Sequence, residues 1–214
     1  MIRTLIMAKA PIPGTVKTRL QIAPEDAARL QAAFIRDTVA KAWLIGPVTL
    51  AGAPPDRLDL ISRLLPPDVA LIPQPEGDLG QRMSSGAATL FEQQPGSVLI
   101  LGTDAPTLTI HAIQEAANAL TSNDVSIIQS VDGGYVLLGL RELHEDVFDG
   151  IEWSTEAVYR QTLERARDAG FSVWEGEPWY DVDTPQDLVR LANDVLANPE
   201  VAPRTAQVVK RLRA

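Results

Sequence analysis

Short apolar runs alternate with longer amphipathic stretches along this chain. The apolar runs have the length of strands and cover residues 3–7, 48–51, 69–72, 98–101, 125–129 and 135–140. Helical patterns occupy residues 28–42, 57–65, 80–93, 110–120, 154–168 and 185–197. Such alternation is typical of a mostly parallel sheet that is covered by helices on its faces. The pattern therefore predicts an α/β fold.

The size of the chain favours one domain. It has 214 residues, of which 45% are hydrophobic, and this is enough for a sizeable core. No linker separates halves of different composition, so we expect a single domain over residues 1–197. Residues 198–214 form a basic extension with Arg204, Lys210, Arg211 and Arg213. We expect that extension to be a solvated terminal helix or a frayed end.

The charge of the chain excludes several classes of partner. A formal net charge of -9 disfavours binding to nucleic acid or to an anionic membrane surface. No apolar run reaches the length of a membrane span, and the first seven residues lack a cleavable signal pattern, so a soluble cytoplasmic protein is expected. The chain contains no cysteine, which excludes thiolate metal sites and thiol nucleophiles. Its two histidines, His111 and His144, lack the spacing of metal ligands.

Two carboxylates stand directly before a late helix. Thr184 is predicted as its N-cap, Pro185 as its first residue and Asp187 as a capping-box acid. Asp181 and Asp183 therefore lie in the loop that enters the helix, where the helix dipole favours negative charge. Hard cations such as magnesium bind oxygen ligands of this kind.

A cationic loop follows the first predicted strand. Lys9, Lys17 and Arg19 are concentrated between residues 8 and 20, around Gly14. Loops at the carboxyl ends of parallel strands bind ligands in α/β folds, and cations there neutralise phosphate charge. The spacing differs from that of a P-loop. The alternative is a solvated loop whose cations balance nearby acids.

Asp104 follows the apolar strand predicted at residues 98–101, just after Gly102 and Thr103. A carboxylate at the tip of a central strand is held rigidly and faces ligand, which suits a magnesium ligand. A turn or capping aspartate ahead of Pro106 is the competing interpretation. As a pair, Asp104 and Asp183 resemble the two carboxylates that commonly converge on a metal in phosphoryl transfer.

Three further segments have both a structural and a functional interpretation. Residues 77–83 suit the base or ribose edge of a nucleotide, or a simple junction between loop and helix. The first interpretation of residues 132–135 is a hairpin turn, and the second is a contact for an acceptor substrate. The first interpretation of residues 153–156 is a hydrophobic anchor with an N-cap, and the second is a wall of the substrate-binding site.

Five segments together resemble one family: residues 8–20, 77–83, 102–106, 132–135 and 179–185. The family is the DUF2064-type bacterial transferase 1 group, which is associated with radical-SAM and selenium-domain genes and often labelled glycosyltransferase. The resemblance covers about residues 3–196. The group is similar to the nucleotide-diphospho-sugar transferase superfamily. This implies a single-domain GT-A fold, with a mixed, mainly parallel sheet and helices on both faces.

The resemblance also implies roles for individual residues. Lys17, Arg19 and Asp104 are expected to be catalytic, and Mg²⁺ or Mn²⁺ is expected on Asp104 and Asp183, with Asp181 as an auxiliary carboxylate. The predicted nucleotide-binding residues are Ala8, Lys9, Gly14, Lys17, Arg19, Gly77, Asp78, Gly80 and Arg82. The predicted acceptor-binding residues are Asp132, Gly133, Gly134, Tyr135, Trp153 and Thr155.

The expected activity is metal-dependent transfer from a nucleotide to a small acceptor. Nucleotidyl transfer from a nucleoside triphosphate to a phosphorylated or hydroxyl acceptor is preferred, since the cationic loop suits a triphosphate. Glycosyl transfer from a nucleotide sugar and a non-catalytic nucleotide-binding regulator are the alternatives. The expected partners are a nucleotide and a small acceptor, with a homodimer possible and with neither nucleic acid nor a membrane span.

Overall fold

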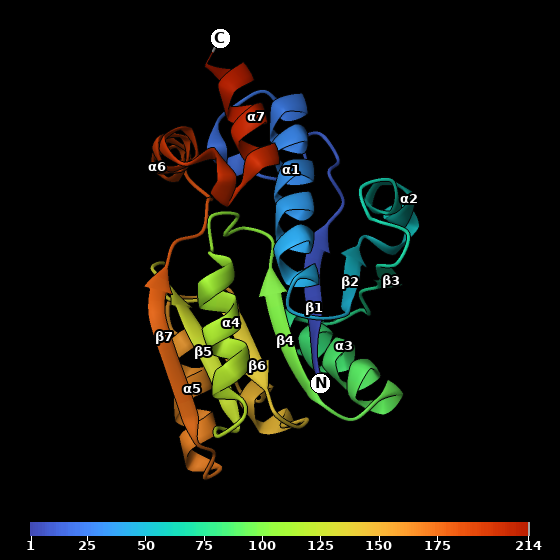
Figure 1. Cartoon of the computed structure of the whole chain (residues 1–214), viewed down its shortest axis with the longest axis vertical. Helices are drawn as coiled ribbons and strands as arrows, with labels where there is room; N and C mark the ends of the chain where they lie inside the picture. Colours follow the sequence, from blue (N-terminus) through green and yellow to red (C-terminus); the bar gives the residue numbers. More distant parts are fainter. Residues whose placement is uncertain (214) are drawn as a thin grey trace.

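The computed structural model describes residues 1–213 and contains one seven-stranded sheet in the order β3-β2-β1-β4-β6-β5-β7 (Figure 1). β6 is antiparallel to both of its neighbours, β4 and β5, whereas the other neighbouring pairs are parallel. The predicted mixed, mainly parallel α/β sheet is confirmed. The strands are β1 (Ile2–Lys9), β2 (Val48–Ala53), β3 (Ala70–Pro73), β4 (Ser97–Gly102), β5 (Val125–Ser130), β6 (Tyr135–Leu140) and β7 (Val173–Trp179).

Helices cover both faces of the sheet (Figure 1). Because side chains alternate along a strand, Leu5 and Ile6 of β1 enter different cores. Leu5 packs with α3 (Leu79–Gln93) and α5 (Val158–Asp168). Ile6 packs with α1 (Pro24–Trp43) and the short α2 (Leu58–Ser62), and α4 (Ile110–Ala119) extends the same side over β4 and β6.

The C-terminal segment packs beyond the carboxyl ends of the strands. α6 (Pro185–Ala197) and α7 (Pro203–Leu212) join the first half of α1 in a separate apolar cluster (Figure 1). The cluster includes Leu20, Leu30, Phe34, Tyr180, Val182, Leu191, Ala206 and Val209. The expectation of a solvated or frayed tail is therefore wrong for α7, because one of its faces is buried although its other face is charged.

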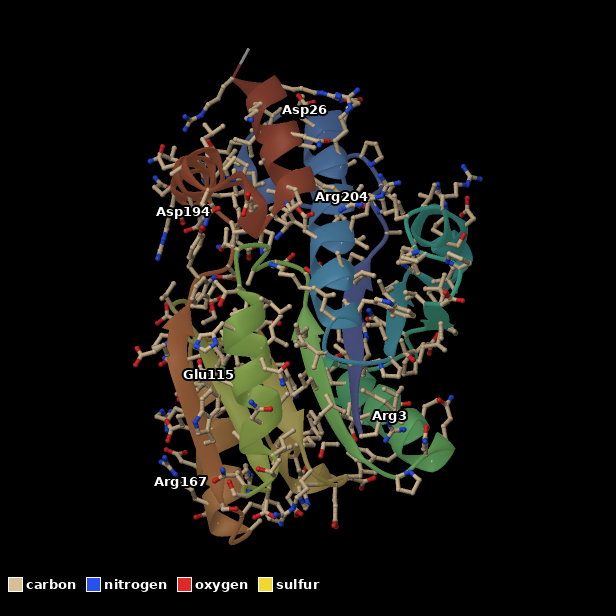
Figure 2. The ribbon with its side chains drawn as sticks, in the orientation of Figure 1. Arg3, Asp26, Glu115, Arg167, Asp194 and Arg204 are labelled. Atoms are coloured by element: carbon tan, nitrogen blue, oxygen red, sulfur yellow. The ribbon has the colours of Figure 1, made fainter. Side chains whose placement is uncertain are left out.

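A buried carboxylate of α1 holds the start of α7. Asp37 is 2% exposed and accepts hydrogen bonds from the backbone N–H groups of Arg204 and Thr205, at 3.2 and 2.8 Å. It thereby satisfies free N–H groups at the helix start, which the N-cap residue Ala202 leaves without a side-chain acceptor. Figure 2 shows Arg204 where α7 meets α1. Negative charge is favourable at that end of a helix.

The predicted helix boundaries differ most from the observed ones in three places. The helix expected from residue 28 begins at Pro24. The helix expected at residues 57–65 is a 3₁₀ turn (Pro55–Arg57) followed by α2. The helix expected from residue 154 begins at Val158, since Ser154 has a φ of +66°, outside the right-handed helical region. β7 was not predicted because Glu175, Gly176 and Glu177 interrupt its apolar pattern at the exposed edge of the sheet. No helix in residues 1–213 combines the length and the apolar character needed to cross a membrane.

Candidate active site

A cleft of about 1070 Å³ lies over the carboxyl ends of β1 and β4. The loop after β1 forms one wall, and the β5–β6 hairpin together with residues 153–158 forms another. Most of the residues that the sequence predicts for the site line this cleft. They are Ala8, Lys9, Lys17, Arg19, Asp78, Arg82, Asp104, Asp132, Gly134, Tyr135, Trp153, Thr155, Asp181 and Asp183.

Four predicted glycines do not line the cleft, and each has a structural reason. Gly14 has a φ of +80° and supports the turn closed by the hydrogen bond from Thr15 N to Ile12 O. Gly77 has a φ of +122°, and Gly80 leaves room for the ring of Trp153. Gly133 has a φ of +95° and lets the hairpin approach the backbone of Glu156. These structural roles account for the four glycines, and their contact with a nucleotide or an acceptor stays a prediction.

Lys17 joins the two carboxylates that the sequence singled out. Its Nζ lies 2.7 Å from Asp104 Oδ1 and 3.2 Å from Asp183 Oδ1, and its side chain is only 4% exposed. The same Nζ donates a hydrogen bond to the carbonyl of Val182 at 2.9 Å. Lys17 itself has left-handed backbone angles, with φ of 51° and ψ of 32°. This conformation is uncommon for a residue other than glycine and occurs often at functional sites.

The surroundings of Lys17 fix it in this position. Its Nζ lies 5.4 Å from the centre of the Phe34 ring, within the range of a cation–π contact. The backbone N–H of Val182 donates to the carbonyl of Asp104 at 2.8 Å and ties the two acidic loops together. Three segments that are far apart in sequence therefore meet at one ammonium group.

The start of α6 orients Asp183 as the sequence predicts. Thr184 is the N-cap and forms a capping box with Asp187, and Pro185 occupies the first turn. The N–H of Asp183 also donates to Asp187 Oδ2, at 3.2 Å. Arg19 lies 3.4 Å from Asp183 Oδ2, but its side chain is 72% exposed. This exposed ion pair is weak, so Arg19 can turn to a bound anion at little cost.

Asp181 has a different environment. It accepts a hydrogen bond from the Ser130 hydroxyl at 3.0 Å. Burial raises the pKa of Asp181 to about 6, and the negative charges of Asp132 and Asp183 act in the same direction. Within residues 1–213 no group of three or more His, Cys, Asp or Glu side chains is placed to hold a metal ion. The predicted set of Asp104, Asp181 and Asp183 is therefore not assembled as a three-carboxylate site.

The pair of Asp104 and Asp183 nevertheless has the right chemistry for a hard divalent cation. Both carboxylates converge on one point, now marked by Lys17 Nζ. Magnesium commonly binds through one or two carboxylates and completes its shell with water and substrate phosphates. Asp104 and Asp183 fit that mode of binding better than a closed site built from protein ligands alone.

The other end of the cleft is formed by the hairpin and the segment before α5. Asp132 Oδ1 accepts a hydrogen bond from Gly134 N at 3.0 Å and closes the turn, so the predicted hairpin is confirmed. Tyr135 points its hydroxyl towards Met83 Sδ, at 3.7 Å, and burial raises the pKa of this hydroxyl. The phenol therefore stays neutral at this end of the cleft.

Comparison with known proteins places this geometry in a family. A family model described as "Uncharacterized protein conserved in bacteria (DUF2064)" matches residues 37–155. The chain belongs to the DUF2064 family. A solved structure from Desulfovibrio desulfuricans G20, which carries the provisional name nucleotide-diphospho-sugar transferase, is 31% identical and has a TM-score of 0.91. That match covers 98% of this chain and 94% of the other.

More distant solved structures share the fold. 4-diphosphocytidyl-2C-methyl-D-erythritol synthase from Anaerococcus prevotii DSM 20548 is 15% identical, with a TM-score of 0.62 and coverage of 92% of this chain and 99% of that one. A CMP:2-keto-3-deoxy-manno-octonic acid synthetase in complex with CTP is 12% identical, with a TM-score of 0.55 and the same coverage of both chains. No curated protein matches the sequence. The predicted fold, that of the nucleotide-diphospho-sugar transferases, is confirmed for the DUF2064 chain.

The sequence analysis missed two glutamines that line the cleft, Gln31 and Gln74. Both are buried, at 3% and 8% exposure. Gln31 is a polar residue within the buried face of α1, and Gln74 directly follows β3. A polar residue in an apolar helix face, or at the carboxyl end of a strand, is the signal that could have identified them. Ser130 also lines the cleft and lies outside the selected segments, whereas Thr103, Ser154 and Glu156 line it within segments that the sequence analysis names.

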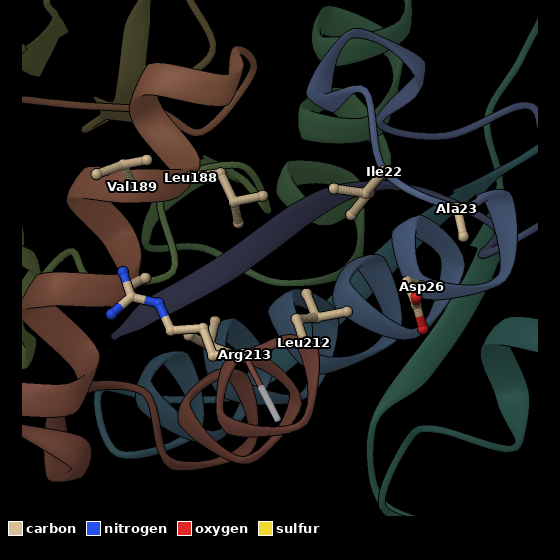
Figure 3. A pocket seen from close by; sticks show the side chains of 9 residues that line it. Ile22, Ala23, Asp26, Leu188, Val189, Leu212 and Arg213 are labelled. Atoms are coloured by element: carbon tan, nitrogen blue, oxygen red, sulfur yellow. The ribbon is translucent and has the colours of Figure 1, made fainter.

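A second hollow lies away from this site, between the start of α1, α6 and α7. It has a volume of about 380 Å³ and is lined mainly by apolar side chains, including Ile22, Leu188 and Leu212 (Figure 3). Asp26 and Arg213 supply its charged groups. None of the predicted site residues lines it, so the cleft over β1 and β4 is the candidate active site.

Proposed function

We propose that this protein is a metal-dependent nucleotidyltransferase that acts on a nucleoside triphosphate and a small hydroxyl acceptor. One observation carries the proposal: Lys17 bridges Asp104 and Asp183 at the centre of the cleft. A buried cation beside two convergent carboxylates suits a triphosphate and its divalent cation. The likeness of the fold to the nucleotide-diphospho-sugar transferases supports the transferase class.

The reaction would be an in-line attack of the acceptor on the α-phosphate, with diphosphate as the leaving group. Asp104 and Asp183 would hold Mg²⁺ or Mn²⁺, which supplies electrostatic stabilisation of the phosphate oxygens when bound. Lys17, held by the Val182 carbonyl, would neutralise charge that develops on the leaving diphosphate. Arg19 would close on the same phosphates from the exposed side. Positioning and charge stabilisation supply most of the catalysis in reactions of this type.

The number of cations favours a triphosphate over a nucleotide sugar. Lys9, Lys17, Arg19 and Arg82 all line the cleft. A triphosphate carries more negative charge than the diphosphate of a nucleotide sugar, so it gains more from this cluster. Glycosyl transfer would need the same leaving-group contacts. The experiment must therefore distinguish glycosyl transfer from nucleotidyl transfer.

The charge at the far end of the cleft favours a hydroxyl acceptor over a phosphorylated one. Asp132, Glu156 and Asp181 line that end. Burial is the main cause of the raised pKa of Asp181, and the negative charges of Asp132 and Asp183 add to it. A phosphate group on the acceptor would be repelled by these carboxylates, whereas hydroxyl groups can donate hydrogen bonds to them.

The test is ligand binding followed by turnover. Thermal shift with each nucleoside triphosphate and with common nucleotide sugars, with and without Mg²⁺ or Mn²⁺, identifies the donor, because a ligand of the native state raises the melting temperature. Release of diphosphate is then measured with panels of hydroxyl and phosphorylated acceptors. We expect a metal-dependent shift with a triphosphate and acceptor-dependent release of diphosphate.

Two variants control the interpretation. Asp104→Asn should abolish the metal-dependent shift, whereas Arg29→Met, which alters an exposed ion pair with Asp26 outside the cleft, should preserve it. A shift with nucleotide sugars alone would replace this proposal with glycosyl transfer. Binding of a triphosphate without release of diphosphate from any acceptor would instead favour a regulator.

A further inference from the structure

The Lys17 ammonium lies where a divalent cation would contact the cleft. Its Nζ is 2.7 Å from Asp104 Oδ1 and 3.2 Å from Asp183 Oδ1, so one cation already lies between two carboxylate oxygens. Magnesium would bind the same oxygens at about 2.0–2.1 Å. A divalent ion and an ammonium on the same two oxygens would repel each other strongly, because like charges at such short range are poorly screened in a cleft. The two cations therefore exclude each other.

Contacts with the protein stabilise the ammonium in this position. The Lys17 side chain is 4% exposed, and its Nζ donates to the Val182 carbonyl at 2.9 Å and lies 5.4 Å from the centre of the Phe34 ring. The side chains of Asp104 and Asp183 are 49% and 34% exposed, so an ion from solution can reach them. Lys17, rather than access from solvent, is thus the obstacle to an ion.

Arg19 provides the matched comparison. It carries the same charge and contacts the same Asp183, with Nη1 3.4 Å from Oδ2. Its side chain is 72% exposed, and it makes no ion pair with Asp104 among the residues that the structure describes. Arg19 therefore adds positive charge beside the carboxylates without lying between them.

Phosphate groups can draw Lys17 away from the carboxylates. A lysine ammonium is a point charge on a flexible four-carbon stem, so it can change partners while its backbone stays in place. Phosphate oxygens form charge-assisted hydrogen bonds with an ammonium, as carboxylates do. A triphosphate beside Lys17 would accept its hydrogen bonds and leave Asp104 and Asp183 to a divalent ion.

We propose that Lys17 blocks the binding of a divalent cation to Asp104 and Asp183 until the phosphates of a nucleotide draw its ammonium away. This inference rests on the proposed nucleotidyltransferase function and adds an order of assembly. The ion binds together with the nucleotide or after it, and not before it. A residue that only supported the metal site would act in the opposite direction, because its loss would weaken metal binding.

The experiment measures binding of Mn²⁺ to the protein without nucleotide, from the electron paramagnetic resonance signal of the unbound ion. Wild type, Lys17→Met and Arg19→Met are compared. If the ammonium leaves the carboxylates in fewer than about one molecule in ten, Lys17→Met should lower the Kd for Mn²⁺ at least about tenfold. Arg19→Met should change it by less than about threefold, since an exposed ion pair is weak.

Three outcomes of this experiment would overturn the proposal. They are equal affinities in wild type and Lys17→Met, weaker binding in Lys17→Met, and an equal gain in Lys17→Met and Arg19→Met, which would reflect net charge alone. The double variant Lys17→Met/Asp104→Asn locates the ion. It should lose the gain in affinity, and a gain that persists would place the ion elsewhere and refute the block.

A crystallographic measurement on the wild type keeps the proposal testable even if Lys17→Met fails to fold. Crystals are soaked in MnCl₂, with and without a triphosphate, and Mn²⁺ is located by its anomalous scattering. With the triphosphate, we expect Mn²⁺ on Asp104 and Asp183 and Lys17 Nζ on phosphate oxygens. Mn²⁺ bound to both carboxylates while Lys17 Nζ still contacts them would overturn the proposal.

Failure of the inference and failure of the proposed function give different results. If neither wild type nor Lys17→Met binds Mn²⁺, with or without any triphosphate, the metal-dependent function is refuted and the block with it. If wild type without nucleotide binds Mn²⁺ as tightly as Lys17→Met does, and wild type still releases diphosphate, only the block by Lys17 is refuted.

Discussion

The two halves of the cleft differ in charge along one continuous surface. The half over β1 and β4 combines the cations Lys9, Lys17, Arg19 and Arg82 with the carboxylates Asp78, Asp104 and Asp183, whereas the half beside the β5–β6 hairpin contains the carboxylates Asp132, Asp181 and Glu156. In the proposed reaction, this difference would place the anionic donor in the first half and the less anionic acceptor in the second, although both halves share one sheet edge.

The halves are also held differently. In the first, a single ammonium group ties together the loops after β1 and β4 and the loop before α6. In the second half, close backbone contacts hold the segments together. Gly133 packs against the backbone of Glu156, and the Gly133 carbonyl accepts a hydrogen bond from Tyr159 N at 2.9 Å. Substitution of one side chain should therefore damage the first half much more than the second.

The largest effect is expected from Lys17→Met. It removes the buried cation and leaves Asp104 and Asp183 without their shared partner. Loss of one preorganised electrostatic group typically costs ~10²–10³-fold in rate, and we expect a loss of that size in kcat/KM for the nucleotide. Diphosphate release at saturating acceptor measures it. A loss below about threefold would show that charge in the first half is not essential to turnover.

The next largest effect concerns the metal, and it compares three carboxylates. Asp104→Asn and Asp183→Asn should each raise the Mg²⁺ concentration that gives half-maximal activity. Loss of a residue that only supports a metal ligand typically lowers metal affinity by roughly 10–100-fold, so the loss of a direct ligand should cost at least as much. Asp181→Asn should change it less, because Asp181 bonds to Ser130 and is not grouped with the other two in the described chain. Titration with Mg²⁺ after treatment with a chelator gives the three values. Equal shifts in all three variants would contradict the two-carboxylate arrangement.

Much of this organisation could be predicted from sequence, because the signals are local. The N-cap at Thr184, the hairpin after Asp132 and the carboxylate after β4 each depend on a few neighbouring residues, and all three are observed. Parallel strands bring such ends together at one edge, so their shared cleft also follows.

The missed features depend on contacts between distant segments. Gln74 gains its orientation from carbonyls of β1 and β2, and Gly80 is required by the ring of Trp153. Neither contact leaves a periodic signal in the sequence. β7 is an edge strand with polar residues, so alternation could not reveal it. Asp37 resembles an ordinary surface residue of a helix until α7 is seen packed against it.

A smaller effect is expected when the acidic half is altered. Asp132→Asn keeps the acceptor for Gly134 N but removes one negative charge. Hydrogen bonds to charged groups contribute about 1.5–3 kcal/mol, so a change of roughly tenfold in the KM of a hydroxyl acceptor is expected. Discrimination against phosphorylated acceptors should fall in the same variant. KM for the nucleotide should stay within about twofold, since Asp132 lies in the other half.

Glu115→Gln is the matched control for Asp132→Asn. Glu115 is an exposed residue of α4 (Figure 2) and does not line the cleft, and its substitution removes the same unit of charge. If this control changed the acceptor KM as much as Asp132→Asn does, net charge rather than the local acidic half would govern the choice of acceptor.

The smallest effect on activity, and a measurable one on stability, is expected from Lys41→Met. Lys41 Nζ donates to the carbonyls of Pro106 and Leu108 in the loop after Asp104, and to that of Val201 before α7. Burial lowers the pKa of Lys41 to about 8, and the nearby Asp37 opposes that shift. Loss of these bonds should cost about 1–3 kcal/mol, and hence a few degrees in Tm. KM for the nucleotide should rise only a few fold as the Asp104 loop loosens, while KM for the acceptor stays constant. A rise in both constants would mean that the two halves of the cleft are mechanically coupled through α1, and that their separation is one of charge alone.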